Sequence, residues 1–194
     1  MIDEPIILKI KEKIESNLFV FEGANGSLGL SFLRILKDTY IKPYKLLLTT
    51  YRSELDFEWY TLDCEIIHLK ASDSNFLKER KKILDDNYDA NVIFASGYGR
   101  PNKFNSDHLS VIEANVKNIL GYSGANIESF AFISTSELYT GHTENVHESS
   151  VLLSGPEHPR SIYIESKRLA ESIVHHILSK NCKRVAIYRV ALAF

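Results

Sequence analysis

The sequence is poor in cysteine, in long apolar runs and in net charge of either sign. Its two cysteines, Cys64 and Cys182, form no CxxC pair, which excludes a disulfide framework and a four-ligand zinc site. No run of roughly 18 apolar residues occurs, and acidic residues stand at the start of the chain, so neither a membrane span nor a signal peptide is expected. A formal net charge of −2 provides no basic stripe for nucleic acid. These absences predict a cytoplasmic protein without a metal site.

Length and composition are those of one globular domain. The chain has 194 residues, of which 44% are hydrophobic and 25% are charged. A chain of this size buries roughly 70% of the surface that it exposes when unfolded, so it forms a core without metals or disulfides. We expect a short amphipathic helical extension over residues 1–16 and a single domain over residues 17–194.

Short apolar runs alternate along the chain with segments of helical periodicity. The expected strands are residues 17–22, 44–50, 64–69, 91–95, 129–134 and 184–190. The expected helices are residues 27–38, 75–86, 107–120 and 160–179. Several of the strand segments are almost continuously apolar, which suits parallel strands buried on both faces. The alternation predicts an α/β fold with a doubly wound parallel sheet that has helices on both faces.

Three glycines follow the first predicted strand and open the first predicted helix. In the segment GANGSLG they are Gly23, Gly26 and Gly29, spaced GxxGxxG rather than GxGxxG. The absence of side chains lets the backbone turn sharply and approach a pyrophosphate, which the free N–H groups of the helix then bind. The other residues of this predicted phosphate loop are Asn25, Ser27 and Leu28. The alternative is a glycine-rich turn that only packs a helix on a strand.

The end of the second predicted strand bears on the choice of cofactor. A dinucleotide site usually places an acid there, where it binds the ribose hydroxyls, but the segment LLLTTYRS has no acid before Glu54. Thr50 and Arg52 take this place as candidate cofactor contacts. Arg52 is either a ligand for the 2′-phosphate of NADP or a solvated surface residue, so the sequence leaves the choice between NAD and NADP open.

The segment SIYIESKRLAE brings a phenol and an amine together. Tyr163 stands four residues before Lys167, so the two share one face of a helix. An ammonium beside a phenol favours the phenolate and lowers the pKa of the tyrosine, which then acts as a general base near neutral pH. A YxxxK spacing alone is common, but the hydroxyls of residues 134–136 end the fifth predicted strand, where ligands bind. Glu137 follows as a candidate acid or base, or as a solvated loop acid.

Three motifs in this order resemble those of one known family. GANGSLG, ISTSELY and YIESK, between Leu18 and Phe194, are similar to those of the extended short-chain dehydrogenase/reductases, specifically the NAD-dependent epimerase/dehydratase family. The resemblance implies a Rossmann fold and a tightly held NAD that oxidises a hydroxyl, usually at C4, of a nucleotide-activated sugar. The resemblance implies Tyr163 as the catalytic base, Lys167 as its partner and Thr135 as the catalytic hydroxyl. It also implies that Ala95 and Ser96 form a turn that lines the cofactor and that Asn115 supports the active site.

The residues of two motifs indicate one group within this family. STSE and PRSIYIESKRLAE are similar to motifs of the UDP-glucuronate decarboxylases, in which the glutamate matching Glu137 lies at the active site. Ser136 stands where dehydratases of the family carry an aspartate, which argues against dehydration. The family's C-terminal substrate lobe has no counterpart in the sequence, so the resemblance implies the N-terminal portion of a longer enzyme, incomplete on its own.

The resemblance also implies partners. The predicted helices at residues 107–120 and 160–179 are similar to the pair through which this family dimerises as a four-helix bundle, and the substrate would be a nucleotide sugar. Two other functions stay open on the sequence. One is a non-catalytic NAD(P)-binding module, favoured by the missing acids, and the other is a reductase of a carbonyl substrate other than a sugar.

Overall fold

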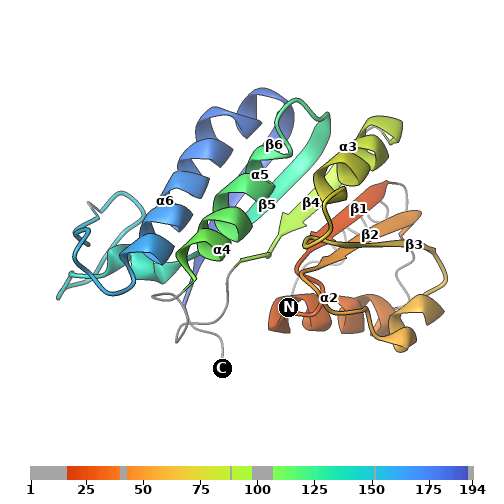
Figure 1. Ribbon diagram of the computed structural model, residues 1–194, viewed down its shortest axis with the longest axis horizontal. Coiled ribbons are helices and arrows are strands. Elements are labelled where there is room, and N and C mark those ends of the chain that lie inside the picture. Colours follow the sequence, from red (N-terminus) through yellow and green to blue (C-terminus); the bar gives the residue numbers. More distant parts are fainter. Residues whose placement is uncertain (1–16, 40–42, 88, 98–106, 151, 192–194) are drawn as a thin grey trace.

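Six parallel strands form a single sheet in the order β3-β2-β1-β4-β5-β6 (Figure 1). This computed structural model describes residues 17–39, 43–87, 89–97, 107–150 and 152–191. The predicted doubly wound α/β fold is confirmed. The helical extension predicted for residues 1–16 lies outside the described residues.

The elements follow the predicted alternation of strand and helix. The strands are β1 (Leu18–Glu22), β2 (Lys45–Thr50), β3 (Glu65–Lys70), β4 (Ala90–Phe94), β5 (Ile127–Thr135) and β6 (Cys182–Val190). The helices are α2 (Ser27–Asp38), α3 (Phe76–Asp86), α4 (His108–Ile112), α5 (Asn118–Leu120) and α6 (Ser161–His176), with 3₁₀ turns η1 (Phe57–Thr61), η4 (Ser136–Tyr139) and η5 (Leu178–Lys180). None of the described helices is long and apolar enough to cross a membrane, and no described group of three or more His, Cys, Asp or Glu side chains could hold a metal ion.

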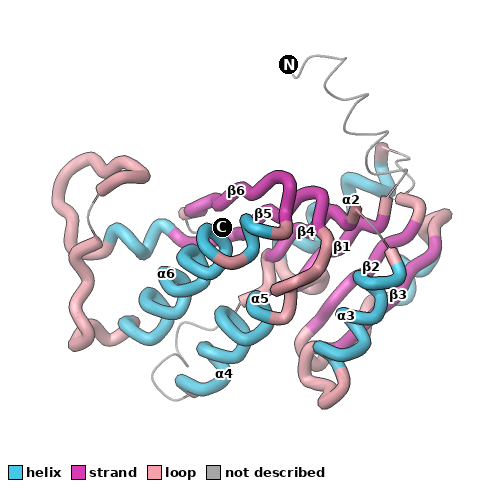
Figure 2. Tube along the Cα trace, turned by 90° about the horizontal axis from the view of Figure 1, so that it is seen from above, coloured by secondary structure: helices cyan, strands magenta, loops and turns pink. Residues whose placement is uncertain are grey.

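Two apolar layers hold the helices against the sheet. On one face, α3, α4, α5 and α6 pack over a cluster that includes Val20, Phe130 and Ile173 (Figure 2). On the other face, α2 and η1 pack over a cluster that includes Phe21 and Trp59. Because successive side chains of a strand point to opposite faces, a strand such as β1 supplies apolar residues to both layers. This explains why the strand segments are almost continuously apolar.

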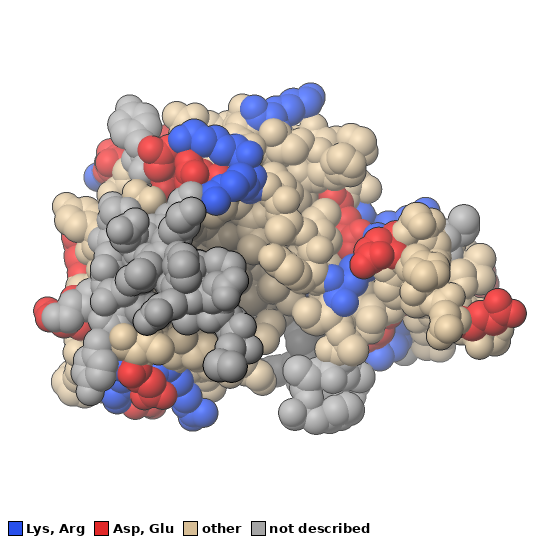
Figure 3. All heavy atoms as spheres, turned by 180° about the vertical axis from the view of Figure 1, so that it is seen from behind, with Lys and Arg blue, Asp and Glu red and all other residues tan. Residues whose placement is uncertain are grey.

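The second face of the sheet is covered over about half of its width. Among the described residues, no helix lies over this side of β4, β5 and β6. A hollow of about 550 Å³ opens there, and its lining includes Ile93, Ala131, Ala186 and Tyr188. Figure 3 shows mostly uncharged atoms across much of this side. Within the described ranges, helices thus lie on both faces of the sheet beside β1 and β2, and on one face beside β5 and β6.

The helix predicted for residues 107–120 is interrupted. After α4 the chain forms a π-helical turn, η3 (Glu113–Lys117), before α5 resumes. A π turn is a local widening of a helix that often occurs at functional sites. It carries Asn115, which is fully buried and whose amide donates to the Ser166 hydroxyl of α6 at 2.9 Å. The irregular turn therefore brings a predicted site residue against α6.

Candidate cofactor-binding and catalytic site

The chain turns sharply at the glycine-rich loop between β1 and α2. Gly23 has a φ of +92°, which favours glycine, and a Cβ there would lie 3.1 Å from both the Ala95 carbonyl oxygen and the Ser96 nitrogen. A Cβ on Gly29 would lie 2.4 Å from the Ala24 carbonyl oxygen, so α2 packs this closely only because glycine stands there. Two of the three glycines thus have a structural reason for their positions.

The first turn of α2 is open to solvent, since residues 25–28 are all exposed. The first N–H groups of a helix have no helical partner and carry the positive end of its dipole, so an anion such as a phosphate binds well there. Asn25 also has a structural role. Its amide donates to the Ser53 hydroxyl and to the Glu54 carbonyl, both at 2.9 Å, and so ties the loop to the segment after β2.

The threonines at the end of β2 bind other protein groups. Thr49 donates to the buried Glu22 carboxylate at 2.5 Å. The Thr50 hydroxyl donates to the Ser53 carbonyl at 2.6 Å and lies 2.8 Å from Nε2 of His68. Thr50 is only 3% exposed. The hydroxyl of this predicted cofactor contact is therefore already engaged within the protein.

A hollow of about 340 Å³ opens beside Arg52, at the carboxyl ends of β2 and β3. Its lining includes Tyr51, Arg52, Ser72, Asp73, Glu113 and Lys117. The guanidinium carbon of Arg52 lies 4.9 Å from the centre of the Tyr51 ring. The first acid after β2, Glu54, pairs with Lys70 of β3. Sequence reasoning missed the contribution of the π turn to this hollow, because only the fold brings that turn beside β2.

A run of close contacts links the glycine turn to α6. Residues 95 and 96, directly after β4, lie against Gly23. The next residue, Gly97, lies beside both Asn115 and Lys167, since a Cβ on it would be 3.0 Å from Oδ1 of Asn115 and 3.1 Å from Nζ of Lys167. The structure thus brings these predicted site residues together around the end of one strand.

Lys167 is buried, and its amine is directed at the sheet. The residue is 5% exposed, and its Nζ donates to the Ile133 carbonyl at 3.0 Å and lies 4.9 Å from the centre of the Phe132 ring. Burial lowers the pKa of the amine to about 8, while the charge of Glu171 acts in the opposite direction. At neutral pH the amine is therefore mostly protonated but close to its titration.

Tyr163 and Thr135 meet at the end of β5, close enough for the Thr135 side chain to affect the pKa of the phenol. Burial is the largest influence on the pKa of the Tyr163 phenol and raises it, and the charge of Glu137 acts in the same direction. Thr135 and the charge of Arg160 lower this pKa, but by less. In the chain without cofactor, the Lys167 amine binds a backbone carbonyl and burial dominates, so the pKa of the phenol lies above its usual value, and a lower pKa beside Lys167 and a bound nicotinamide stays a prediction. The phenol is therefore protonated at neutral pH.

A charged pair borders Tyr163. Nη2 of Arg160 lies 2.7 Å from Oε1 of Glu137, and the guanidinium carbon lies 5.7 Å from the centre of the Tyr163 ring. Burial raises the pKa of the Glu137 carboxyl, although Arg160 and His158 act against this shift. Glu137 is thus a half-buried, paired acid rather than a solvated one. Sequence reasoning missed Arg160, for which the PRS segment just before the tyrosine is the available signal.

The chain matches the model of the NAD dependent epimerase/dehydratase family over residues 22–193. A comparison with curated proteins found no match. Among solved structures, the chain is similar to the UDP-glucose 4-epimerase from Brucella ovis in complex with NAD, with a TM-score of 0.68 and 13% identity over 90% of this chain and 52% of that one. It is also similar to the UDP-glucuronic acid 4-epimerase from Bacillus cereus in complex with UDP-glucuronic acid and NAD (TM-score 0.63, 18% identity, 89% of this chain and 55% of that one).

A third similar structure is the PbgP3 protein from Burkholderia pseudomallei, with a TM-score of 0.69 and 16% identity over 89% of this chain and 57% of that one. The chain therefore spans about half the length of these solved proteins, and at such low identity the likeness shows the fold. The family model covers nearly the whole chain, including the glycine turn, the end of β5 and the Tyr163–Lys167 pair. The chain belongs to the NAD-dependent epimerase/dehydratase family.

Proposed function

We propose that this chain binds NAD and performs the proton transfers of an enzyme that modifies nucleotide sugars. The observation that carries the proposal is the run of contacts from Gly23 through residues 95–97 to Lys167. It joins a turn suited to phosphates with a partly buried phenol, Tyr163, and with a buried hydroxyl and amine, Thr135 and Lys167. The similar epimerase structures from Brucella ovis and Bacillus cereus contain NAD, which agrees with a dinucleotide lying along this path.

The residues present fit such a cofactor. The exposed first turn of α2 and its glycines leave room for the backbone to approach a pyrophosphate. A Cβ on Gly97 would fill space between Oδ1 of Asn115 and Nζ of Lys167, and this space suits the hydroxyls of a ribose. When bound there, NAD supplies the hydride acceptor for oxidation of the sugar.

The side chains at the end of β5 perform the proton transfers. Tyr163 takes the proton of the sugar hydroxyl, at C4 in our proposal, and Thr135 binds the same oxygen. Because burial raises the pKa of Tyr163, the base needs positive charge nearby, which the Lys167 ammonium and the oxidised nicotinamide provide. The Glu137–Arg160 pair supports a second proton transfer after the ketone has formed. Among the reactions open to such a ketone, we favour decarboxylation of a hexuronate, because the STSE and PRSIYIESKRLAE motifs are similar to those of UDP-glucuronate decarboxylases.

We expect the site to accept NADP as well as NAD. Arg52 is exposed beside the 340 Å³ hollow, while Glu54, the first acid after β2, is paired with Lys70. Calorimetric titration of Arg52→Ala should show NADP binding weakened by roughly 10-fold, from loss of a charge-assisted bond, and NAD binding unchanged within about twofold. Lys45→Ala, at the amino end of β2 and therefore at the other end of this strand from Arg52, is the control for the loss of one positive charge. Equal weakening of both cofactors would contradict a contact between Arg52 and a 2′-phosphate.

We also propose a homodimer through α4 and α6. Leu109, Ile112 and Leu169 are apolar side chains on these helices that are 77%, 41% and 51% exposed. Replacing Leu109 and Leu169 together by Asp is expected to weaken dimerisation by roughly 30-fold or more, because two apolar contacts become charged. Sedimentation velocity over a range of concentrations measures this. Leu153→Asp, at a leucine that is 55% exposed outside these helices, is the control. A wild-type chain that stays monomeric at high concentration would refute the dimer.

A further inference from the structure

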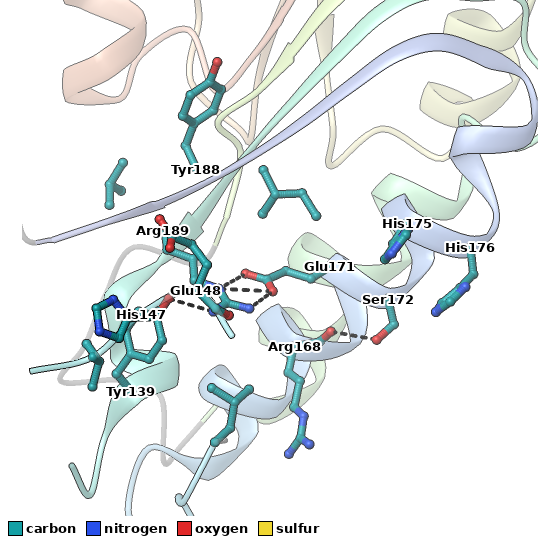
Figure 4. A pocket seen from close by; sticks show the side chains of 14 residues that line it. Tyr139, His147, Glu148, Arg168, Glu171, Ser172, His175, His176, Tyr188 and Arg189 are labelled. Atoms are coloured by element: carbon teal, nitrogen blue, oxygen red, sulfur yellow. Dashed lines mark hydrogen bonds and ion pairs between the residues drawn. The ribbon is translucent and has the colours of Figure 1, made fainter. Parts of the chain in front are cut away.

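Arg189 of β6 lies at a hollow of about 730 Å³ between β6, α6 and the segment after β5 (Figure 4). Its guanidinium donates to both carboxylate oxygens of Glu171, with Nε 2.9 Å from Oε1 and Nη2 2.7 Å from Oε2. Its Nη1 donates to the Tyr139 hydroxyl at 2.7 Å and to the Glu148 carbonyl at 3.0 Å. One side chain thus joins β6, α6, the turn η4 and the loop that follows it.

Glu171, the acid of this ion pair, stands one helical turn after Lys167 on α6. Glu171 follows Lys167 by four residues on α6, so the two side chains share one face of the helix. On the neighbouring strand, Arg189 is in register with Ser134, the residue after Ile133, whose carbonyl accepts the amine. The Glu171 carboxylate therefore acts electrostatically on two cations, the Lys167 ammonium of α6 and the Arg189 guanidinium of β6.

We propose that Glu171 and Arg189 are positioning residues for the candidate catalytic site. The Glu171 carboxylate supports the charged form of Lys167, and the Arg189 guanidinium limits this support by neutralising part of the carboxylate's field. The proposal deepens the function proposed above and rests on it for its consequence, since the charge of Lys167 affects catalysis if Tyr163 is the base. The electrostatic coupling itself depends only on the protein.

The surroundings of Lys167 make the Glu171 carboxylate the main charge that acts on it. Among the described residues, the other groups shown beside the amine are the Phe132 ring, the Ile133 carbonyl and Gly97, with the Asn115 amide on the other side of Gly97, and none of them carries a charge. Burial lowers the pKa of the amine, and Glu171 is the described group whose charge raises it. Both carboxylate and guanidinium are largely shielded from water, with side chains 11% and 20% exposed, so solvent screens their fields only in part.

NMR titration of the protein with ¹³C-labelled lysine side chains measures the pKa of Lys167 directly, and Lys167→Met identifies its resonance. Glu171→Gln is expected to lower this pKa from about 8 by about 0.5 to 1 pH unit, because the ammonium loses its carboxylate. Arg189→Met is expected to raise it by a smaller amount, because the charge of Glu171 is no longer partly neutralised and Glu171 is the charge that acts most strongly on the amine. Since both variants break the same ion pair, a merely structural role would not shift the pKa in opposite directions.

Two conservative variants separate charge from packing. Arg189→Lys keeps the charge and is expected to leave the Lys167 pKa near its wild-type value even where stability falls. Tyr139→Phe removes a neutral partner of Arg189 and should have no effect on the pKa. If a single charge-removing variant does not fold, the Glu171→Gln/Arg189→Met double variant leaves no unpaired charge and is expected to have a pKa below that of the wild type.

Shifts in the same direction in Glu171→Gln and Arg189→Met, an unchanged pKa in both, or an unchanged pKa in the double variant would overturn the proposal. The titration needs neither NAD nor a sugar. Its failure would therefore leave the proposed function standing, and a failure of NAD binding or reduction would leave the measured coupling standing.

Discussion

The Tyr163→Phe variant is expected to bind NAD with wild-type affinity and to reduce it with a nucleotide sugar roughly 10²- to 10⁴-fold more slowly, the usual loss when a general base is removed. The phenol is the group that takes the hydroxyl proton in our proposal, while the phosphates are bound by the glycine turn on a different element. Absorbance of the reduced cofactor, with UDP-glucuronic acid or UDP-glucose as substrate, measures the rate, and calorimetry measures the affinity. Product analysis then separates epimerisation from decarboxylation.

The pH dependence of the same reaction gives a second test of this base. Burial raises the pKa of Tyr163, so the reactive phenolate becomes more abundant as the pH rises, and the wild-type rate should increase from neutral to alkaline pH. The Phe variant should lose that increase. Tyr44→Phe, at an exposed tyrosine before β2, should keep both rate and pH profile. A Phe variant within tenfold of the wild type would show that Tyr163 is not the base, and a wild-type chain that never reduces NAD would contradict catalysis by this chain alone.

The sheet could be predicted because its strands are apolar runs, of which β1, β2 and β4 are buried along almost their whole length. Each strand begins and ends within two residues of the range expected from its apolar run, and α2 (Ser27–Asp38) has the predicted ends. The glycine turn was predictable for a related reason: a positive φ at Gly23 and a backbone contact at Gly29 are local demands that only glycine meets. These features depend on residue type and periodicity, which a sequence displays directly.

Side-chain partners were less predictable, because they are set by contacts between distant segments. The sequence places Tyr163 and Lys167 on one helical face, but the amine finds the carbonyl of Ile133 on β5 instead of the phenol. Likewise Thr50 looks like a ligand contact from its position at a strand end, yet it bonds to His68 of the adjacent strand. The ion pair of Arg160 with Glu137 also joins two segments across a loop. Each outcome required the packed fold.

A buried charge cluster beneath the glycine turn was also hidden in the sequence. Nη1 of Arg80 donates to Oε1 of Glu22 at 2.6 Å and its Nη2 to the Asn118 carbonyl at 2.7 Å, while Tyr122 and Thr49 each donate to the Glu22 carboxylate at 2.5 Å. The side chains of Arg80 and Glu22 are 0% exposed. Because Glu22 directly precedes Gly23, this cluster fixes the strand end from which the phosphate turn starts.

Arg80→Met is expected to destabilise the fold by about 3 to 5 kcal/mol, since it leaves a buried carboxylate without its counterion. Urea unfolding followed by circular dichroism measures the loss, and Lys81→Met, which removes a solvent-exposed cation paired with Asp85, is the control expected to change stability little. The Glu22→Gln/Arg80→Met double variant should recover part of the loss, because the uncompensated charge is gone and the amide still accepts from Thr49 and Tyr122. A single variant as stable as the wild type, or a double variant less stable than Arg80→Met, would mean that the pair contributes through packing and not through charge. In that case the strand end before Gly23 would be held by the aromatic rings of Phe76 and Tyr122, whose centres lie 4.9 and 4.0 Å from the guanidinium carbon.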